Sequence, residues 1–394
     1  MGNEWPRETT RQLARRVWQK TVSIGDASID FDPRQGQLGK MRSVLATAAL
    51  ALASPGIVHA EGDDLTILHS YGYADPDLHQ DYTAKHGISP SFVLTDDTFQ
   101  TFADENGSLH VQAAYTCSSS LASWVASGKV EKWDLSRIPN VTYRFAEGLL
   151  GDDPEKLREY FLPYDYGALW VTYNSDQVPD ADIRDFDIFM NPAYAGQVSI
   201  PADSDDAFSL AFLATGVTDM NLVTEQDIEA AVAWLEEVHH NLASYWDDED
   251  VLLDELVEGE ILVTWAWNGI GSWANEYEGA IRHAMGPDTG SALWTCGFVK
   301  IASDHASDDR LYDYINAVLA DNSAPLMLDW GLGFANETVM ASEDYEDMTT
   351  ELGLSKPVGA VLNQSSVPPE LHDRLRTEFE RISGLSMDKH AMTD

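Results

Sequence analysis

Basic residues are scarce in this sequence, and their scarcity excludes several classes of protein. Its 394 residues include 24 Lys and Arg against 66 Asp and Glu, a formal net charge of −42. Residues 1–60 hold eight basic and five acidic residues, so residues 61–394 hold 16 and 61, a net charge of −45. Nucleic acids and anionic lipid surfaces are bound by basic patches, so neither is an expected partner. Such an acidic surface stays soluble in concentrated salt, which indicates a saline habitat.

Motifs of common enzyme classes are also missing. There is no H-E-x-x-H metal motif, and the serines in "YTCSSSLASW" lack a G-x-S-x-G elbow. Glu236 and His240 lie one helical turn apart and could hold a metal, but an exposed polar helix face is far commoner. "GIGSWA" (269–274) matches G-x-G-x-x-A, yet no convincing βαβ unit follows it. We therefore expect no catalytic residue, no metal and no cofactor.

Long apolar runs are absent except for one short run near the N-terminus. It covers about 43–53, follows two basic residues and precedes a small-residue cleavage pattern at 58–60. This arrangement is typical of a secretory signal, and the run is too short to span a bilayer comfortably. We expect a signal peptide over residues 41–60 and a periplasmic mature protein. Residues 1–40 are then a disordered extension or an untranslated segment.

Cysteine is the last scarcity, because Cys117 and Cys296 are the only two in the chain. An oxidising compartment outside the cytoplasm would allow them to pair. Both could equally remain reduced and buried, since a free thiol packs as a small apolar group. The residues alone do not decide between these alternatives.

What the chain does contain is an alternation of short strands and helices. Strand and helix alternate from residue 65 to residue 128, and the pattern restarts after "LPYDYGALWVTYN" (162–174). Such repetition predicts α/β layers around mostly parallel sheets. The expected helices include one that begins near Ala207 and one over "EQDIEAAVAWLEEVHHNLA" (225–243). Two successive α/β units joined by extended crossings predict two lobes with a cleft between them.

Three aspartates, Asp203, Asp205 and Asp206, follow the expected strand that ends at Pro201. Asp203 and Asp206 resemble a capping box, and acidic residues in a first turn complement the helix dipole. They could instead hold a positively charged ligand, although the local pattern alone favours capping. Paired carboxylates together with 12 Trp would also suit a glycosidase, with acid, base and stacking platforms, which is the best enzyme alternative.

Seven stretches resemble, in order, the periplasmic spermidine/putrescine-binding proteins of ABC importers. They are "LTILHSYGY" (65–73), "SGKVEKWDLSRIPNV" (127–141), "LPYDYGALWVTYNSDQV" (162–178), "FMNPAYAGQVSIPADSDDAF" (189–208), "LVEGEILVTWAWNG" (256–269), "SALWTCGFVKIASDH" (291–305) and "DWGLGFANE" (329–337). The resemblance covers most of residues 62–340. It implies an α/β, two-lobed periplasmic binding protein fold with a hinged ligand cleft, its hinges near 164–169 and 290–296.

The resemblance also implies how the chain is divided and what it binds. Lobe 1 would comprise residues 61–167 plus 291–335, and lobe 2 residues 168–290 plus 336–394. The implied partners are a small-molecule cation in the cleft and the permease subunits of an ABC transporter in the membrane. We expect the protein to be a monomer.

The resemblance assigns a ligand role to the aspartates after Pro201. In that family two carboxylates three residues apart bind the amino groups of the ligand, and Asp203 and Asp206 fall on these positions. Ligands in open α/β sheets lie beyond the carboxyl ends of strands, and a closed cleft of low dielectric strengthens their attraction to charge. Ligand contact is then favoured, although a carboxylate can also cap. The other positions that match ligand contacts of the family are Tyr73, Trp267, Trp294, Ser119 and Asn268.

Four departures from the family pattern bear on specificity. Where the family has the Trp of an Asn-Trp pair near the first strand, this chain has Ser70, followed by Tyr71. Where the family has a Ser in the turn after the third strand, an Asp in the hinge strand and a Tyr late in the chain, this chain has Cys117, Cys296 and Leu332. Loss of that third carboxylate removes a charge-assisted anchor of about 1.5–3 kcal/mol. We therefore expect a shorter ligand or one with a single cation. A quaternary ammonium would suit an aromatic box with few carboxylates.

Both cysteines thus map to one wall of the implied cleft, and Tyr71, Cys117 and Cys296 join the candidate ligand contacts. A disulfide between the cysteines would give the pocket an apolar floor, while two reduced thiols near the site are the alternative. We predict a secreted substrate-binding subunit of an ABC importer that captures a polyamine-like or quaternary ammonium ligand. The alternative function is a secreted carbohydrate-binding protein or glycosidase.

Overall fold

A computed structural model describes residues 57–58, 65–95, 97–105, 108–141, 154–271, 280–285, 289–302, 308–354 and 359–385. The expected extension over residues 1–40 lies outside these described residues. Of the expected signal peptide, only β1 (Ile57–Val58) is described, and it pairs antiparallel with β3 (Ser91–Leu94).

The described strands join in one mixed sheet. Its main path runs β1-β3-β2-β4-β11-β6-β9-β7-β8, while β10 and β12 pair with β6, and β5 and β13 with β11. The other strands are β2 (Thr66–His69), β4 (Ala113–Cys117), β5 (Val130–Glu131), β6 (Phe161–Asn174), β7 (Val198–Pro201), β8 (Leu242–Trp246), β9 (Val263–Trp267), β10 (Ile281–His283), β11 (Ser291–Ile301), β12 (Gly333–Phe334) and β13 (Val361–Asn363).

The prediction of mostly parallel sheets holds toward the two ends of this path, apart from the antiparallel β1–β3 pair, and for the pairing of β13 with β11. At these ends, β2 lies parallel to β3 and β4, and β7 lies parallel to β8 and β9. In the middle, β6 is antiparallel to β11 and β9, and β11 is antiparallel to β4. The reason is that β6 and β11 are long single strands rather than parts of βαβ units, so no crossover helix forces them to run parallel.

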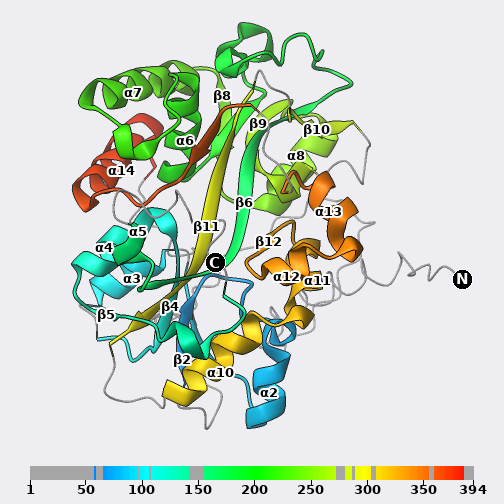
Figure 1. Cartoon of the computed structure of the whole chain (residues 1–394). Helices are drawn as coiled ribbons and strands as arrows, with labels where there is room; N and C mark the ends of the chain where they lie inside the picture. The colour runs from blue at the N-terminus through cyan, green and yellow to red at the C-terminus, as the bar shows by residue number, and fades with distance from the viewer. Residues whose placement is uncertain are drawn as a thin grey trace, which may run out of the picture. The chain divides into compact units, whose positions relative to one another are not determined.

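Helices gather at the two ends of β6 and β11 (Figure 1). The first group includes α2 (Gln80–His86), α3 (Thr98–Asp104), α4 (Leu121–Ala126), α5 (Pro154–Leu157), α10 (Asp308–Val318), α11 (Ala324–Asp329) and α12 (Glu337–Met340), while α13 (Glu346–Glu351) lies beside the middle of β6. The second group includes α6 (Ser204–Ala214), α7 (Glu225–His239), α8 (Glu249–Glu258) and α14 (Pro369–Ser383).

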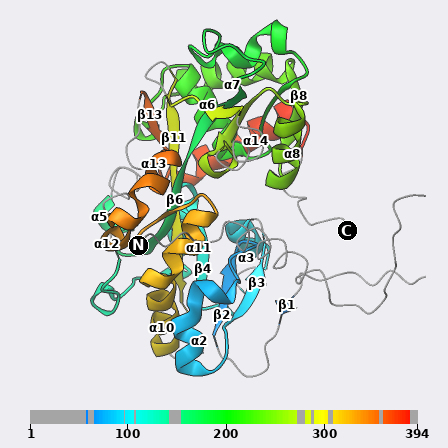
Figure 2. The ribbon, with the colours of Figure 1, turned by 90° about the vertical axis from the view of Figure 1, so that its right-hand side faces the viewer.

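The buried side chains form separate cores that correspond to two lobes. One core surrounds β7, β9 and α6 and contains Phe208 and Trp265, while another surrounds β2, β4 and α10 and contains Tyr115 and Tyr314. Strand β6 is buried along its whole length and contributes to both. Figure 2 shows β6 and β11 running side by side between the two groups of helices. The fold is therefore the expected two-lobed α/β fold, with two long strands as the crossings.

Two local predictions need correction near the candidate site. Helix α6 begins at Ser204 rather than near Ala207, because Asp203 caps it and the polar residues 204–206 form its first turn. Helix α7 ends at His239, and the following "LASYW" is strand β8, which extends the sheet beside β7. Aromatic and apolar residues after a helix can continue it or start a strand, and here pairing with β7 decides the outcome.

Candidate functional site

The N-terminus of α6, directly after β7, is the first part of the candidate site. Asp203 has extended backbone geometry, and its Oδ1 accepts a hydrogen bond from the Asp206 backbone N–H at 2.9 Å. Half of the expected capping box is therefore present. The other half, from the Asp206 carboxylate to the Asp203 N–H, is not among the hydrogen bonds of the described residues. The Asp206 side chain is thus available for other partners.

The Asp206 carboxylate is buried and is held by two neutral donors. Its Oδ2 accepts from Trp267 Nε1 at 2.9 Å, and its Oδ1 accepts from Gln364 Nε2 at 2.7 Å. The residue is only 6% exposed. Trp267 is the last residue of β9, and Gln364 directly follows β13, so three separate segments meet at this one acid. A buried carboxylate with only neutral donors lacks a compensating positive charge.

The electrostatics of the neighbouring acids reinforce this deficit. Burial raises the pKa of Asp206 well above its usual range, and the Asp203 carboxylate raises it further, against the two hydrogen bonds. Asp203 reaches solvent, but the surrounding protein removes much of its hydration and, together with Asp205, raises the pKa of Asp203 to about 6. A cation placed between these carboxylates would favour their ionised forms.

Asp205 stands between these acids in sequence but has a charged partner of its own. Its Oδ1 lies 3.4 Å from Nε2 of His372 on α14. Burial favours the neutral acid, yet the His372 imidazolium holds the pKa of Asp205 below its usual value. In return, the Asp205 carboxylate raises the pKa of His372 to about 9. The charge of Asp205 is therefore compensated within the protein, whereas that of Asp206 is not.

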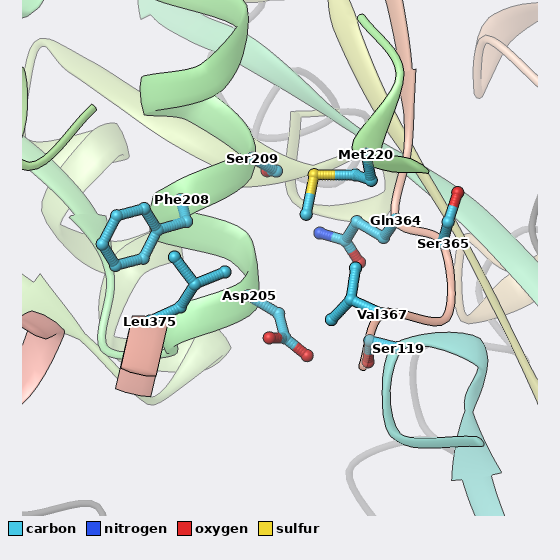
Figure 3. A pocket seen from close by; sticks show the side chains of 9 residues that line it. All are labelled: Ser119, Asp205, Phe208, Ser209, Met220, Gln364, Ser365, Val367 and Leu375. Carbon is cyan, nitrogen blue, oxygen red and sulfur yellow. The ribbon is translucent and has the colours of Figure 1, made fainter. Parts of the chain in front are cut away.

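A small pocket opens beside the first turns of α6 (Figure 3). It is lined by Ser119, Asp205, Phe208, Ser209, Met220, Gln364, Ser365, Val367 and Leu375. Five of these nine residues are polar, but apolar atoms form most of the pocket surface. The one acid among them, Asp205, is paired with His372. Asp206 is not a lining residue, and Gln364 is the side chain that connects the pocket to it. We therefore place the centre of the candidate site at Asp206 rather than in the pocket.

Strand β9 brings two predicted residues, Trp267 and Asn268, to this position. The Trp267 ring is partly buried and meets Trp246 edge-on, with ring centroids 5.0 Å apart. It places an aromatic surface beside the Asp206 carboxylate, a combination that suits an organic cation. Asn268 is buried, and its amide accepts from the Ala168 N–H at 2.9 Å and donates to the Gly331 carbonyl. Its amide is thus occupied by backbone partners.

The structure joins Cys117 and Cys296 in a disulfide. They lie directly opposite each other on the antiparallel strands β4 and β11, with Cα atoms 3.8 Å apart. Of the two alternatives that the sequence leaves open, the structure shows the paired one. Cys296 is buried, while Cys117 is only partly buried.

The remaining predicted contacts occupy different surroundings. Trp294 lies across Gly167, where a Cβ would collide with its ring, and it packs against the cores of both lobes. Tyr73 packs in the same core as the cysteines, and its hydroxyl donates a hydrogen bond to Asp165. Tyr71 is 50% exposed in the turn after β2. Ser119 hydrogen-bonds to Asp205 and lines the pocket.

Three residues of the site were missed from the sequence. Gln364 and His372 come from the C-terminal part of the chain, beyond the last stretch that carries the resemblance. Asp165 lies inside one of those stretches, in the hinge strand β6, but no local pattern marks it. An acid in an otherwise uncharged and largely apolar strand was the available signal.

Two further features of the described residues bear on the class of site. Within the part of the chain that the structure describes, His, Cys, Asp and Glu form no group of three placed to hold a metal ion. Glu236, which the sequence placed near His240, pairs with Arg381 at 2.7 Å. In the same described segments, every helix falls short of the length and apolarity that crossing a membrane requires.

Comparison with known proteins gives a consistent result. Residues 64–350 match the family model described as bacterial extracellular solute-binding protein. The spermidine/putrescine-binding periplasmic protein of Escherichia coli is 25% identical over 262 residues, which cover 64% of this chain and 72% of that protein.

Solved structures with low sequence identity share the fold. A spermidine/putrescine ABC transporter substrate-binding protein from Streptococcus pneumoniae superposes with a TM-score of 0.61 at 17% identity, covering 81% of this chain and 98% of that one. The PBP MotA from A. tumefaciens, solved in complex with glucopine, gives a TM-score of 0.62 at 13% identity, covering 82% of this chain and 100% of that one. One fold thus carries chemically different ligands, so the ligand must be argued from the site.

Proposed function

This chain belongs to the bacterial extracellular solute-binding proteins, and from that premise we propose that it captures a small organic cation for an ABC importer. The observation that carries the proposal is the Asp206 carboxylate, which is buried against Trp267 and Gln364 without a positive partner among the described residues. A ligand ammonium would supply the missing charge, and the Trp267 ring would contact its apolar part.

The division into lobes and the ligand contacts are part of this proposal. We propose lobe 1 over 61–167 plus 291–335 and lobe 2 over 168–290 plus 336–394, and the separate cores support this division except just after residue 335, where Val339 packs in the core of lobe 1. We propose Asp203 and Asp206 as the anionic contacts and Trp267 and Trp294 as the aromatic ones. Tyr71, Tyr73, Ser119, Asn268, Cys117 and Cys296 are the other proposed lining residues. The protein would act as an exported monomer with membrane permease subunits.

The test is a thermal-shift screen of the purified protein followed by calorimetry on each hit. The panel would contain putrescine, spermidine, choline and glycine betaine, with oligosaccharides representing the carbohydrate alternative. A ligand at a hundred times its Kd adds about 2.7 kcal/mol to the free energy of unfolding, a clear shift. Stabilisation by cations alone would support the proposal. Stabilisation by oligosaccharides alone would overturn it in favour of the carbohydrate-binding alternative.

A further inference from the structure

The ion pair between Asp205 and His372 lies where the two proposed lobes meet. Asp205 on α6 and His372 on α14 both belong to lobe 2, and Asp205 Oδ1 is 3.4 Å from His372 Nε2. The Asp205 carboxylate also accepts a hydrogen bond from Ser119 of lobe 1, and Figure 3 shows it pointing toward the turn that carries Ser119. That turn, Ser118–Ser120, contacts α14. One carboxylate therefore connects the two lobes.

Two further hydrogen bonds cross between the lobes beside this pair. The Ser118 hydroxyl donates to the Gln364 carbonyl at 2.7 Å, and the Ala122 N–H donates to the Ser366 hydroxyl at 3.0 Å. Ser118 and Ala122 belong to lobe 1, while Gln364 and Ser366 precede α14 in lobe 2. This segment lies beyond residue 350, where the match to the family model ends. A part of the chain outside that match thus holds α14 against lobe 1.

An acid of lobe 1 faces the same ion pair. Asp97 caps α3, where its Oδ1 accepts from the Gln100 N–H at 2.9 Å. The Asp97 charge is attracted by His372 and repelled by Asp205. Asp203 is the other acid that acts on His372. Closing the lobes therefore brings one acid of lobe 1 toward two acids of lobe 2, and like charges repel more strongly as water leaves the gap between them.

The other bases of α14 have different surroundings. Helix α7 also packs against α14, and its acids pair with two of these bases: Glu225 with Arg374, and Glu236 with Arg381. Arg376 is a second base near the N-terminus of α3. The turn of lobe 1 that contacts α14 consists of three serines and adds no charge. His372 is thus the base of α14 that pairs with an acid at the lobe boundary.

The acids around His372 keep it positively charged at neutral pH. The Asp205 carboxylate, with smaller contributions from Asp203 and Asp97, raises the pKa of His372 to about 9, against the effect of burial. If the lobes separate, Asp97 moves away and the pKa of His372 falls toward the value that lobe 2 sets alone. A group whose pKa is higher in the closed form favours closure when it is protonated. Closure should therefore become less favourable as pH rises through about 9.

We propose that the His372 imidazolium holds the two lobes closed over the bound cation, acting through Asp205 and Ser119 without contacting the ligand. His372 is therefore a positioning residue, and this inference rests on the proposed function. Two groups then limit capture from opposite sides of the pH scale. The Asp206 carboxyl must lose its proton for the cation to bind, and His372 must keep its proton for the lobes to close.

The first test measures choline binding by calorimetry between about pH 7 and pH 10, because choline keeps its charge throughout. Wild-type affinity should fall about tenfold between about pH 8 and pH 10. His372→Gln should bind about tenfold more weakly at neutral pH, because less of the protein is closed, and should lose the alkaline fall. An alkaline fall that persists in His372→Gln overturns the inference.

Two further variants separate the charge of His372 from a merely structural role. His372→Lys keeps a positive charge, so it should recover most of the affinity at neutral pH and move the alkaline fall upward, since lysine titrates at about 10.4. Arg374→Gln removes a base of the same helix that pairs with α7, and it should match wild type at every pH. If His372→Lys binds as weakly as His372→Gln, the positive charge is not what holds the lobes, and the inference is wrong.

The second test needs no ligand, so it separates this inference from the proposed function. Asp97→Asn removes the charge of lobe 1 but keeps a side chain that caps α3 well. An NMR titration of the His372 imidazole, assigned by its absence in His372→Gln, should give a lower pKa in Asp97→Asn than in wild type. An unchanged pKa would show that lobe 1 does not reach His372 and would overturn the inference, even if choline binds. If the pKa shifts but no cation of the screen stabilises the protein, the proposed function fails and the closing contact through His372 stands.

Discussion

Two helices of this protein begin with the same pattern and use it differently. In α7, Thr224 at the N-cap and Asp227 three residues later form a full capping box, and the Asp227 Oδ2 accepts from the Thr224 N–H at 2.9 Å. In α6, Asp203 caps the helix in the same way, but Asp206 turns to Trp267 and Gln364. Asp227 thus accepts a hydrogen bond at the start of its own helix, whereas Asp206 accepts hydrogen bonds from side chains of distant segments.

The electrostatic consequence is opposite in the two helices. Hydrogen bonds from Thr224 hold the pKa of the exposed Asp227 below its usual value, whereas burial raises the pKa of Asp206 well above it. A cap should stabilise its charged form locally, as Asp227 does. An acid that is destabilised as an anion by its own fold is typical of a site that awaits a cation. The comparison therefore separates a structural Asp from the Asp that we propose as a ligand contact, at equivalent helical positions.

The largest expected effect comes from neutralising Asp206, the N3 aspartate of α6. Asp206→Asn should weaken binding of a cationic ligand by about a hundredfold, because it removes a buried charge-assisted contact. Asn keeps the size and the acceptor oxygen, so the fold should be retained. Calorimetry on the purified variant measures the change.

Asp227→Asn is the matched control for this substitution. It removes the same charge at the same helical position of α7 and should leave the affinity within about twofold. Circular dichroism verifies that both variants are folded. Equal affinities for Asp206→Asn and wild type would place Asp206 beside Asp227 as a structural residue and remove the main support for cation capture.

A second effect, of about tenfold per pH unit, follows from the raised pKa of Asp206. A quaternary ammonium keeps its charge at every pH, so its affinity reports the protein groups alone. Below the folded-state pKa the carboxyl must release a proton before the cation binds, and affinity should fall as pH decreases. Calorimetry in buffers of different ionisation enthalpy would detect the released proton. If the affinity for the quaternary ammonium were the same at all pH values, this prediction would be wrong.

The same pKa has a defined sign for stability. The folded-state pKa of Asp206 lies above the unfolded value, so its contribution is complete at low pH and is lost as pH rises through the folded pKa. Asp227 has the opposite sign, and its contribution is lost as pH falls. Without ligand, Asp206→Asn should therefore melt above wild type at neutral pH, and Asp227→Asn should melt below it. Thermal denaturation at two pH values checks both signs.

The sequence could indicate part of the candidate site because the two acids proposed as ligand contacts are close together in the chain. Asp203 and Asp206 belong to one strand–turn–helix unit, and Trp267 ends a strand that hydrophobicity alone reveals. The two-lobed fold followed from the alternation of strands and helices together with the resemblance. The pairing of Cys117 with Cys296 was left open, because bonding across 179 residues depends on strand register.

The rest of the site could not be predicted, because it depends on contacts between distant segments. Gln364 reaches Asp206 across 158 residues, and His372 neutralises Asp205 from α14. The sequence cannot tell which of three neighbouring acids meets a histidine and which stays uncompensated. Likewise, Asp165 lies opposite Cys296, and Cys296 opposite Cys117, only when β4, β11 and β6 are in register. Local pattern gives the residue types, and register gives their partners.

A fourth prediction compares the two N-caps. Asp203→Ala and Thr224→Ala should each lower the free energy of unfolding by about 1 kcal/mol, because each leaves an N3 backbone N–H without its acceptor. Only Asp203→Ala should also weaken cation binding, since Asp203 adds its charge to that of Asp206. Denaturant titration and calorimetry on both variants give the two quantities. A cation affinity unchanged in Asp203→Ala would reduce Asp203 to a cap.

The smallest effect concerns the ion pairs at the same helix ends. Glu225 in α7 forms a two-pronged pair with Arg374, in which Arg374 Nη2 lies 2.7 Å from Oε1, and the Glu225 side chain is 66% exposed. Asp205 in α6 pairs with His372, and their side chains are 23% and 19% exposed. Glu225→Gln should lower the free energy of unfolding only slightly in dilute buffer and not measurably in molar sodium chloride, because salt screens exposed charges. The cost of Asp205→Asn should persist in salt, because its pair is shielded from solvent and an unpaired His372 remains.

Denaturant titrations of both variants at the two salt concentrations test the difference. Equal salt sensitivity would mean that the α6 terminus is as open to solvent as that of α7, and the closed, low-dielectric site proposed around Asp206 would lose its physical basis.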